Sequence, residues 1–353
     1  MKRLILEKEA IKKNLSVIKE KAGGAAIYAV LTGDAYGAGL VEMAKLLREE
    51  GIVRFAVSEP EEAEKLRKAG FVEEELLMLR STTDREELEK LMDLNVICTI
   101  GSYDAGVALN GIAEGRATVA EAHIQVDTGM GFGGFLSSEP DKILSMYRYL
   151  PNVALSGIYT QIHTAAGGER GAQLQLTELN QVLDLIHDAG FETGVVHAAG
   201  SYALMHYDFA RLDGVRVGSA ILGRGRGGRN LTKVGYGEAA LEEIRWLPKG
   251  HTVGNDKLIV LKKPTRVAVL PVGFQNGFGL DVNRGGGFWA ALRRWWRSRS
   301  MTVRIGSQRV KALGKVGAIE TLLDVTELKC APGDLVTFDI DPLLAKGLKK
   351  EFR

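Results

Sequence analysis

Residues 28–39 read YAVLTGDAYGAG, an apolar run that ends abruptly in a turn rich in glycine and polar residues. A short apolar run bounded by turn residues is typical of a buried strand. Seven further runs of this kind follow. The eight runs occupy residues 26–31, 54–58, 76–80, 96–100, 120–126, 155–160, 193–198 and 212–218.

Helical patterns separate these strands. In DREELEKLMDL, residues 84–94, the apolar residues Leu88, Leu91 and Met92 recur at three- and four-residue spacing, which predicts one apolar helix face. Alternating strands and helices predict a parallel sheet with right-handed crossovers. Eight such units favour a closed (β/α)8 barrel of the TIM type, with an open doubly wound sheet as the alternative.

After residue 228 the pattern changes. Strand-like segments joined by turns occupy residues 234–250, 263–274, 301–319 and 334–340. A length of 353 residues suits two domains. We therefore predict a barrel over 1–228 and a mostly β domain over 229–353, with the glycine-rich GRGRGG (223–228) as linker.

Composition excludes some classes of protein. Lys and Arg total 46 against 44 Asp and Glu, which argues against a general nucleic-acid binder. No apolar window is long enough for a membrane span, and the charged first residues predict no secretory signal, so we expect a cytoplasmic protein. Cys98 and Cys330 each lie in an apolar run and are expected to be buried, unpaired thiols.

Distinctive residues fall at the carboxyl ends of five predicted strands, where barrels of this type collect functional groups. These segments are YAVLTGDAYGAG, VDTGMGFGG (126–134), YTQIHTAA (159–166), HAAGS (197–201) and VRVGSAILG (215–223). In this order they resemble the alanine racemase family, a group of pyridoxal-phosphate enzymes with a barrel and a β domain. PVGFQNGF (271–278) and GKVGAIETLLDVT (314–326) resemble the family's later motifs, so the resemblance covers nearly the whole chain.

The resemblance implies a lysine that anchors the cofactor and serves as one base, and a tyrosine from the partner subunit as the other. Thr32 stands at the lysine position and Phe274 at the tyrosine position. A threonine hydroxyl forms no imine, and a phenylalanine has no proton to exchange. Five more family positions differ: Phe132 for arginine, Gln161 for histidine, Gly200 for asparagine, Ala318–Ile319 for Met-Asp, and Phe352 for tyrosine. We therefore expect no intact catalytic residue and no covalent cofactor.

Other family positions are kept. Tyr36, Ser201, Arg216 and Gly218 match residues that hold the cofactor's phosphate and ring nitrogen in the family. Together with the amide of Ser219, they predict a small anion site that takes a phosphate group without a covalent link. The alternatives are a structural Arg216 paired with a carboxylate and a Tyr36 that only packs.

The remaining polar residues at strand ends have simpler interpretations. His197 is expected to be a hydrogen-bonded structural histidine, and Asp127 to form a turn. His163 lies two residues past Gln161, so it would share that face if the strand continued and partly replace the missing histidine. No His, Cys or Asp cluster has the spacing of metal ligands, so no metal site is predicted.

One segment adds to the family pattern. GGGFWAALRRWWRSRS (285–300) predicts a helix with an aromatic side and a basic side. Its aromatic residues include Trp289, Trp295 and Trp296. Such a helix can lie on an anionic membrane surface or fill a partner's groove, and the alternative is packing on its own domain or across a dimer interface.

Three functions remain open. The first is a dimeric, non-catalytic binding or regulatory homologue of the racemases. The second is a pyridoxal-phosphate-dependent alanine or other amino-acid racemase, which supplies D-alanine for cell-wall synthesis. The third is a different reaction in the same barrel with a cofactor held non-covalently.

Overall fold

The computed structural model describes residues 1–163, 168–225, 230–254, 259–280 and 302–353. The chain forms two compact units, one of Glu9–Lys233 and one that joins Met1–Lys8 to Val234–Arg353. This division differs from the predicted boundary between residues 228 and 229. Strand β1 (Lys2–Leu6) pairs antiparallel with β11 (Tyr236–Ala240), so the first residues belong to the second unit and not to the barrel.

Eight parallel strands form the barrel of the first unit, and each corresponds to a predicted run. They are β2 (Ala26–Val30), β3 (Arg54–Val57), β4 (Glu75–Met78), β5 (Cys98–Ile100), β6 (Ala120–Asp127), β8 (Val153–Tyr159), β9 (Val195–Gly200) and β10 (Gly214–Val217). Their order is β4-β3-β2-β10-β9-β8-β6-β5. A bridge between Leu77 and Ile97, with the Ile97 carbonyl accepting from the amide of Met78 at 2.9 Å, joins the two ends. The TIM-type barrel is therefore confirmed.

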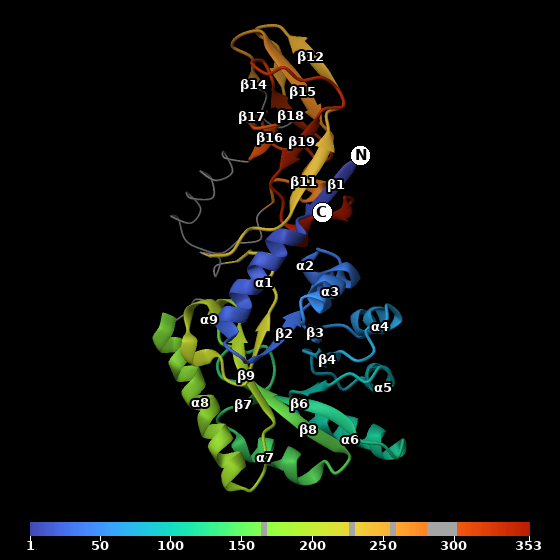
Figure 1. Ribbon diagram of the computed structural model, residues 1–353, viewed down its shortest axis with the longest axis vertical. Helices are drawn as coiled ribbons and strands as arrows, with labels where there is room; N and C mark the ends of the chain where they lie inside the picture. The colour runs from blue at the N-terminus through green and yellow to red at the C-terminus, as the bar shows by residue number, and fades with distance from the viewer. Residues whose placement is uncertain (164–167, 226–229, 255–258, 281–301) are drawn as a thin grey trace. The chain divides into compact units, whose positions relative to one another are not determined.

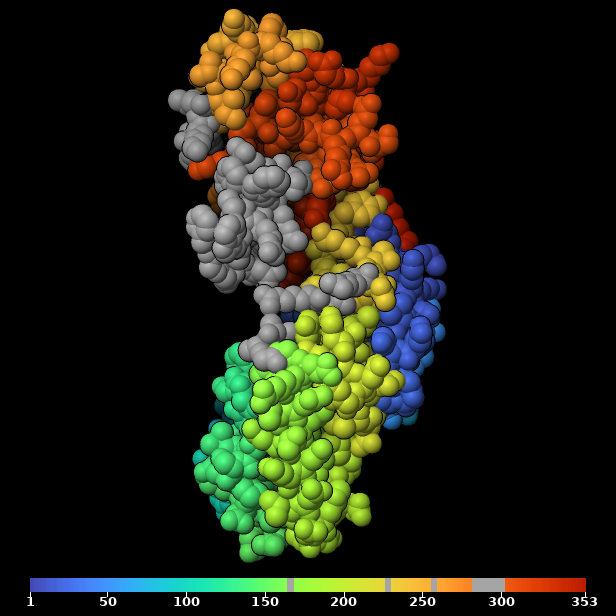
Figure 2. All heavy atoms as spheres, turned by 90° about the vertical axis from the view of Figure 1, so that its left-hand side faces the viewer, coloured from blue at the N-terminus to red at the C-terminus, as the bar shows by residue number. Residues whose placement is uncertain are grey.

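Helices surround this barrel (Figure 1). They are α1 (Lys8–Ala22), α2 (Thr32–Tyr36), α3 (Leu40–Glu49), α4 (Pro60–Lys68), α5 (Arg85–Asp93), α6 (Tyr103–Gly115), α7 (Pro140–Tyr149), α8 (Gly168–Asp188) and α9 (Ser201–His206). The predicted helix over 84–94 is α5: Asp84 caps it by accepting from the amide of Glu87, and Leu88 and Leu91 are buried. The side chains of α8 form much of one face of the barrel unit (Figure 2).

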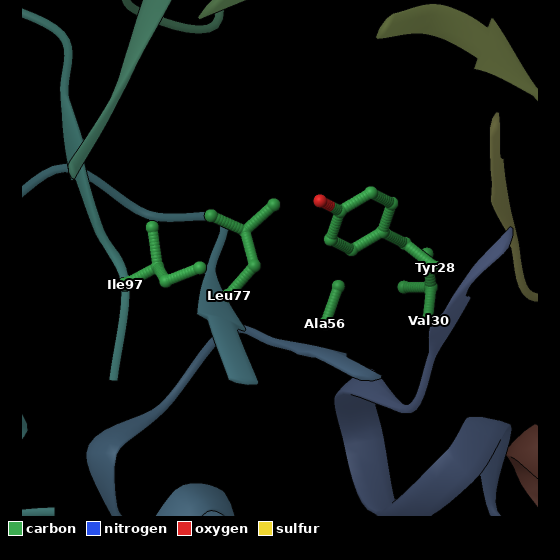
Figure 3. Packing of buried hydrophobic residues seen from close by; sticks show 5 residues of the cluster. All are labelled: Tyr28, Val30, Ala56, Leu77 and Ile97. Atoms are coloured by element: carbon green, nitrogen blue, oxygen red, sulfur yellow. The ribbon is translucent and has the colours of Figure 1, made fainter. Parts of the chain in front are cut away.

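The barrel interior is filled by side chains from neighbouring strands. Tyr28, Val30, Ala56, Leu77 and Ile97 form one buried cluster, in which the Tyr28 hydroxyl points toward Leu77 (Figure 3). A barrel packed in this way has no pore, so a ligand can enter only at the mouth. The carboxyl ends of the strands therefore define where a site can lie.

The second unit is mostly β, as predicted. Its main sheet has the order β12-β15-β18-β17-β16-β19-β11-β1-β20. The other strands of this sheet are β12 (Ile244–Leu247), β15 (Thr265–Leu270), β16 (Val303–Ile305), β17 (Gln308–Leu313), β18 (Thr321–Asp324), β19 (Leu335–Phe338) and β20 (Lys349–Phe352). Strands β13 (Thr252–Val253) and β14 (Ile259–Val260) form a separate pair. In the first unit, the short strand β7 (Phe135–Leu136) pairs with β6.

Three further predictions concern the segment 285–300, the cysteines and membrane spans. The aromatic and basic segment 285–300 lies outside the described residues. Cys98 and Cys330 are free and buried, as expected. Among the helices of the described residues, none combines the length and apolar character needed to cross a membrane.

Candidate functional site

Thr32 begins a turn with unusual backbone geometry at the end of β2. Gly33, Asp34, Ala35 and Tyr36 have φ angles of 62°, 59°, 55° and 55°, in the left-handed region. For a residue with a side chain this region costs about 1–2 kcal/mol. Side-chain hydrogen bonds fix the turn: the Asp34 amide donates to Glu62, and the Asp34 carboxylate accepts from the amide of Leu40.

This turn brings Tyr36 against the ends of β9 and β10. Burial raises the pKa of the Tyr36 phenol, and a hydrogen bond with the Thr32 side chain opposes that rise. A Cβ atom at Gly218 would lie 2.4 Å from the Tyr36 ring, so only glycine fits there. The Ser201 hydroxyl oxygen accepts from the amides of Gly218 and Ala220 at 3.1 and 3.2 Å. We call Thr32, Tyr36, Ser201, Gly218 and Ser219 the cradle.

Arg216 lies beside the cradle in β10 and is 4% exposed. Its guanidinium donates to the His197 ring and carbonyl, to the Thr160 carbonyl and to the Gln161 side chain, at 2.6, 3.2, 2.6 and 2.6 Å. The guanidinium carbon also lies 4.7 Å from the centre of the Tyr159 ring. The alternative of a pairing with a carboxylate is wrong, because all four acceptors are neutral. Burial without an acid lowers the pKa of Arg216 to about 10.

His197 extends this hydrogen-bond network from Arg216 to His123 in the barrel interior. Because Arg216 donates to its Nδ1, His197 carries its proton on Nε2 and donates to Nδ1 of His123 at 3.0 Å. His197 is fully buried and stacks on Tyr159 and Tyr28. The prediction of a hydrogen-bonded structural histidine is confirmed for His197. No sequence motif singled out His123.

This pair predicts how stability depends on pH. Burial, reinforced by the charge of Arg216, lowers the pKa of His123 to about 4. An unfolded histidine titrates near 6.5, so below that pH the unfolded chain binds more protons than the folded one. The contribution of His123, about 3 kcal/mol, is therefore present above pH 6.5 and lost as the pH falls to 4.

Urea unfolding between pH 4 and 7 measures this dependence. In His123→Gln, whose amide oxygen still accepts from His197, the free energy of unfolding should fall less steeply toward low pH than in the parent. The control His251→Gln, at an exposed position of the second unit, should keep the parental slope. Equal slopes in all three proteins would contradict the buried, neutral state of His123.

The Gln161 side chain fills the space that a side chain at position 200 would need. The Gln161 amide donates no bond to residue 200, but its Nε2 atom lies 2.7 Å from where a Cβ of residue 200 would be. A side chain at position 200 would therefore displace Gln161 from Arg216. Two of the departures from the family pattern are thus structurally coupled.

Asp127 shapes the loop after β6. Its carboxylate accepts from the amides of Gly129, Met130 and Gly131 at 2.8 to 3.1 Å, so the predicted turn is confirmed. Burial raises the pKa of Asp127, but these hydrogen bonds outweigh it and leave the pKa below its usual value. The loop holds Phe132 with 82% of its surface exposed. Phe132, Gln161 and Arg216 line one cavity of about 200 Å³.

His163 does not take the place of the missing histidine by strand alternation. Strand β8 ends at Tyr159, before Gln161, so the premise of that prediction is wrong. The amide of His163 donates instead to Gln175 of α8, whose side chain also donates to Thr128 and to the Gln161 carbonyl. Gln175 is buried and fixes this strand end, a role that no sequence motif indicated.

The other predicted positions lie in the second unit. The Phe274 amide donates to the Gly317 carbonyl, and the Gln275 amide to that of Ala318, so the two later motifs lie together. Phe274 and Ile319 are 47% and 60% exposed. Phe352 lies in β20, in register with Leu6 of β1. Within the described ranges, no three His, Cys, Asp or Glu side chains are grouped as metal ligands.

Comparison with known proteins agrees with this geometry. Residues 6–225 match the family model "Alanine racemase, N-terminal domain", and residues 237–342 match "Alanine racemase, C-terminal domain". The alanine racemase of Carboxydothermus hydrogenoformans is 32% identical over 81% of this chain and 79% of that protein. The lysine racemase of Proteus mirabilis is 27% identical over 94% and 79%.

Solved structures share the fold. Alanine racemase from Streptomyces lavendulae superimposes with a TM-score of 0.85 at 19% identity, over 100% of this chain and 97% of the other. The enzyme from Bartonella henselae, with covalently bound pyridoxal phosphate, gives 0.81 at 20% identity, over 100% and 99%. Both family models, in order and over most of the sequence, place the chain in one family. The chain belongs to the alanine racemase family.

Proposed function

We propose that this chain binds a phosphate-bearing ligand in the cradle without a covalent link and acts as a non-catalytic binding or regulatory member of its family. The observation that carries the proposal is the side chain at position 32. Its hydroxyl cannot form an imine with an aldehyde. The nearest lysines in sequence, Lys21 and Lys45, lie on helices α1 and α3.

The family's cofactor fits this site at one end only. Tyr36 and Ser201 would offer hydroxyls to a phosphate, and the Tyr36 ring packs against Gly218, whose amide already donates to the Ser201 hydroxyl. At the position where the cofactor's aldehyde would need an amine, this chain has Thr32. Pyridoxal phosphate therefore does not fit as a covalent cofactor, and we assign no reaction step to it.

The strained turn supports retention of a ligand site. Three residues with side chains, Asp34, Ala35 and Tyr36, keep left-handed backbone angles. Such strain persists only where the surrounding structure imposes it, and it gathers at functional sites. The turn positions the Tyr36 hydroxyl against Gly218, at the end of β10 where the proposed ligand would bind.

Amino-acid racemisation is the second candidate, and the names of the relatives favour it. The alanine racemases and the lysine racemase resemble this chain over most of its length. This reading gives the chain the supply of D-alanine for cell-wall synthesis. It also needs an amine and a second acid/base group from residues other than Thr32 and Phe274.

Binding and exchange experiments separate the candidates. We expect pyridoxal 5′-phosphate and pyridoxine 5′-phosphate, which lacks the aldehyde, to bind with equal affinity in calorimetry, and pyridoxine without phosphate to bind far more weakly. Tyr36→Phe should lower the affinity for the two phosphate-bearing ligands about tenfold, and the exposed control Tyr149→Phe should leave it unchanged. α-Proton exchange of L-alanine in deuterated water should stay at background. Measurable exchange, or strong preference for the aldehyde, would establish the racemase instead.

Assembly and location are proposed by analogy with the family. We propose a homodimer, which light scattering of the purified chain tests directly. We also propose a cytoplasmic location, which fractionation of cells that express the full chain tests.

A further inference from the structure

Asn14 is a buried amide that joins two segments of the barrel unit lying far from it in sequence. It belongs to α1 and is fully buried. Its Nδ2 donates to the carbonyls of Ile221 and Thr232 at 3.0 and 2.7 Å, and its Oδ1 accepts from the amide of Thr232 at 2.7 Å. Two carbonyls and one N–H around this group fix its orientation. Asn14 therefore holds residue 221, just after the cradle, beside residue 232.

The turn after β10 packs against the same Thr232 carbonyl. Gly223 has a φ angle of 59°, and a Cβ atom there would lie 2.0 Å from the Thr232 oxygen, so only glycine fits. The Ile221 amide donates to the Gly218 carbonyl at 3.0 Å, which ties the turn back to the cradle. A shift of the backbone at Ile221 or Thr232 would therefore also move Gly218.

The groups that the turn presents are hydrogen-bond donors. The Ser201 hydroxyl oxygen accepts from the amides of Gly218 and Ala220 at 3.1 and 3.2 Å. A hydroxyl oxygen has two lone pairs, so Ser201 can bond to a ligand only by donating its proton. In the part of the chain that the structure describes, the Ser219 amide between those two has no acceptor. Both groups suit a ligand that only accepts, such as an ionised phosphate.

We infer that Asn14 is a positioning residue for the cradle. Through Ile221 and Thr232 it holds the turn after β10, and that turn places the Ser219 amide and the Ser201 hydroxyl as donors to one phosphate group. Asn14 does not touch the ligand, because it is fully buried and its amide already makes three hydrogen bonds. The inference rests on the proposed function, which supplies the phosphate.

Asn14→Asp tests the inference at nearly constant shape. A carboxylate still accepts from the Thr232 amide but cannot donate to either carbonyl. In calorimetry of the full chain, the affinity for pyridoxine 5′-phosphate should be about tenfold lower than in the parent. The affinity for inorganic phosphate should fall by a similar factor, because the change acts on the phosphate end. Asn14→Ser, whose hydroxyl can still donate to one carbonyl, should lie between the parent and Asn14→Asp.

Matched variants separate positioning from a general loss of stability. Ile18→Val trims another buried side chain of α1 and should lower the urea midpoint while changing phosphate affinity less than about twofold. Gly223→Ala disturbs the Thr232 carbonyl from the side of the turn and should weaken phosphate binding as Asn14→Asp does. Pyridoxine 5′-phosphate should shift the NMR resonance of the Ser219 amide in the parent, and shift it less in Asn14→Asp.

The outcomes keep this inference distinct from the proposed function. If the parent binds pyridoxine 5′-phosphate and Asn14→Asp binds it within about twofold, the role of Asn14 is overturned and the cradle stands. Equal losses of affinity in Asn14→Asp and Ile18→Val would also overturn it. If Asn14→Asp does not fold, Asn14→Ser and Gly223→Ala decide by the same criterion. A parent that binds neither phosphate ligand overturns the proposed function and this inference together.

Discussion

Thr32→Lys should convert the chain from one that holds a pyridoxal phosphate reversibly into one that captures it. The parent protein, treated with pyridoxal phosphate and borohydride, should carry no pyridoxyl group on a residue of the barrel mouth. The variant should carry one on residue 32, because the new amine stands beside the hydroxyl of Tyr36 in the cradle. Peptide mass spectrometry locates the group, and a yellow colour that survives dialysis reports it without digestion.

Capture alone should not restore racemisation. The resemblance to the family assigns the second acid/base group to position 274, which is phenylalanine here. One such group contributes about 10²–10⁴-fold to a rate. Thr32→Lys with Phe274→Tyr should therefore exchange the α-proton of alanine faster than Thr32→Lys alone. Thr32→Ser, which keeps a hydroxyl, is the control and should resemble the parent. A parent protein that already carries a reducible adduct in the barrel would contradict the proposed loss of chemistry.

The barrel was predictable from the sequence because its signals are local. Each of the eight apolar runs became a strand, and α5 formed where Asp84 and the Leu88–Leu91 spacing predicted it. Strand β1 was assigned to the wrong unit because the contacts that place it are long-range. Its partners β11 and β20 lie more than 200 residues away, and a run as short as Leu4–Leu6 carries no information about them.

The site was predictable position by position, but not as a set of contacts. The motif at the end of β2 located Thr32 and Tyr36, yet it did not predict the left-handed backbone of Asp34 and Ala35 between them. Likewise, Gln161 and Gly200 were recognised as separate departures. Their shared space depends on the β8–β9 register and on Gln175 of α8, which long-range packing alone determines.

Arg216→Met should destabilise the barrel by about 4 kcal/mol, the largest effect that we expect from a single substitution. The change would remove the donor from three acceptors: the His197 ring, the Thr160 carbonyl and the partly buried Gln161 side chain. The His197 carbonyl would keep the amide of Thr160. Each unsatisfied acceptor costs about 1–3 kcal/mol, and partial rearrangement recovers some of that sum. Urea unfolding measures the loss.

Two companions make this measurement interpretable. Arg85→Met removes an arginine that is paired with Glu89 and whose side chain is 80% exposed, and it should cost less than about 0.5 kcal/mol. Arg216→Lys keeps a cation with fewer donors and should fall between the two. Near-equal stabilities of Arg216→Met and Arg85→Met would mean that the His197 network does not depend on Arg216.

The stability result also bears on function. If Arg216 supports the barrel, its presence in a chain with threonine at position 32 follows from the fold. It then does not by itself indicate a bound cofactor. The affinity of Arg216→Lys for pyridoxine 5′-phosphate separates the two roles. A structural arginine predicts lower stability with affinity reduced less than about threefold, since in the proposed site Tyr36 and Ser201 would still hold the phosphate. A large loss of affinity at nearly unchanged stability would instead make Arg216 a ligand to the bound ring.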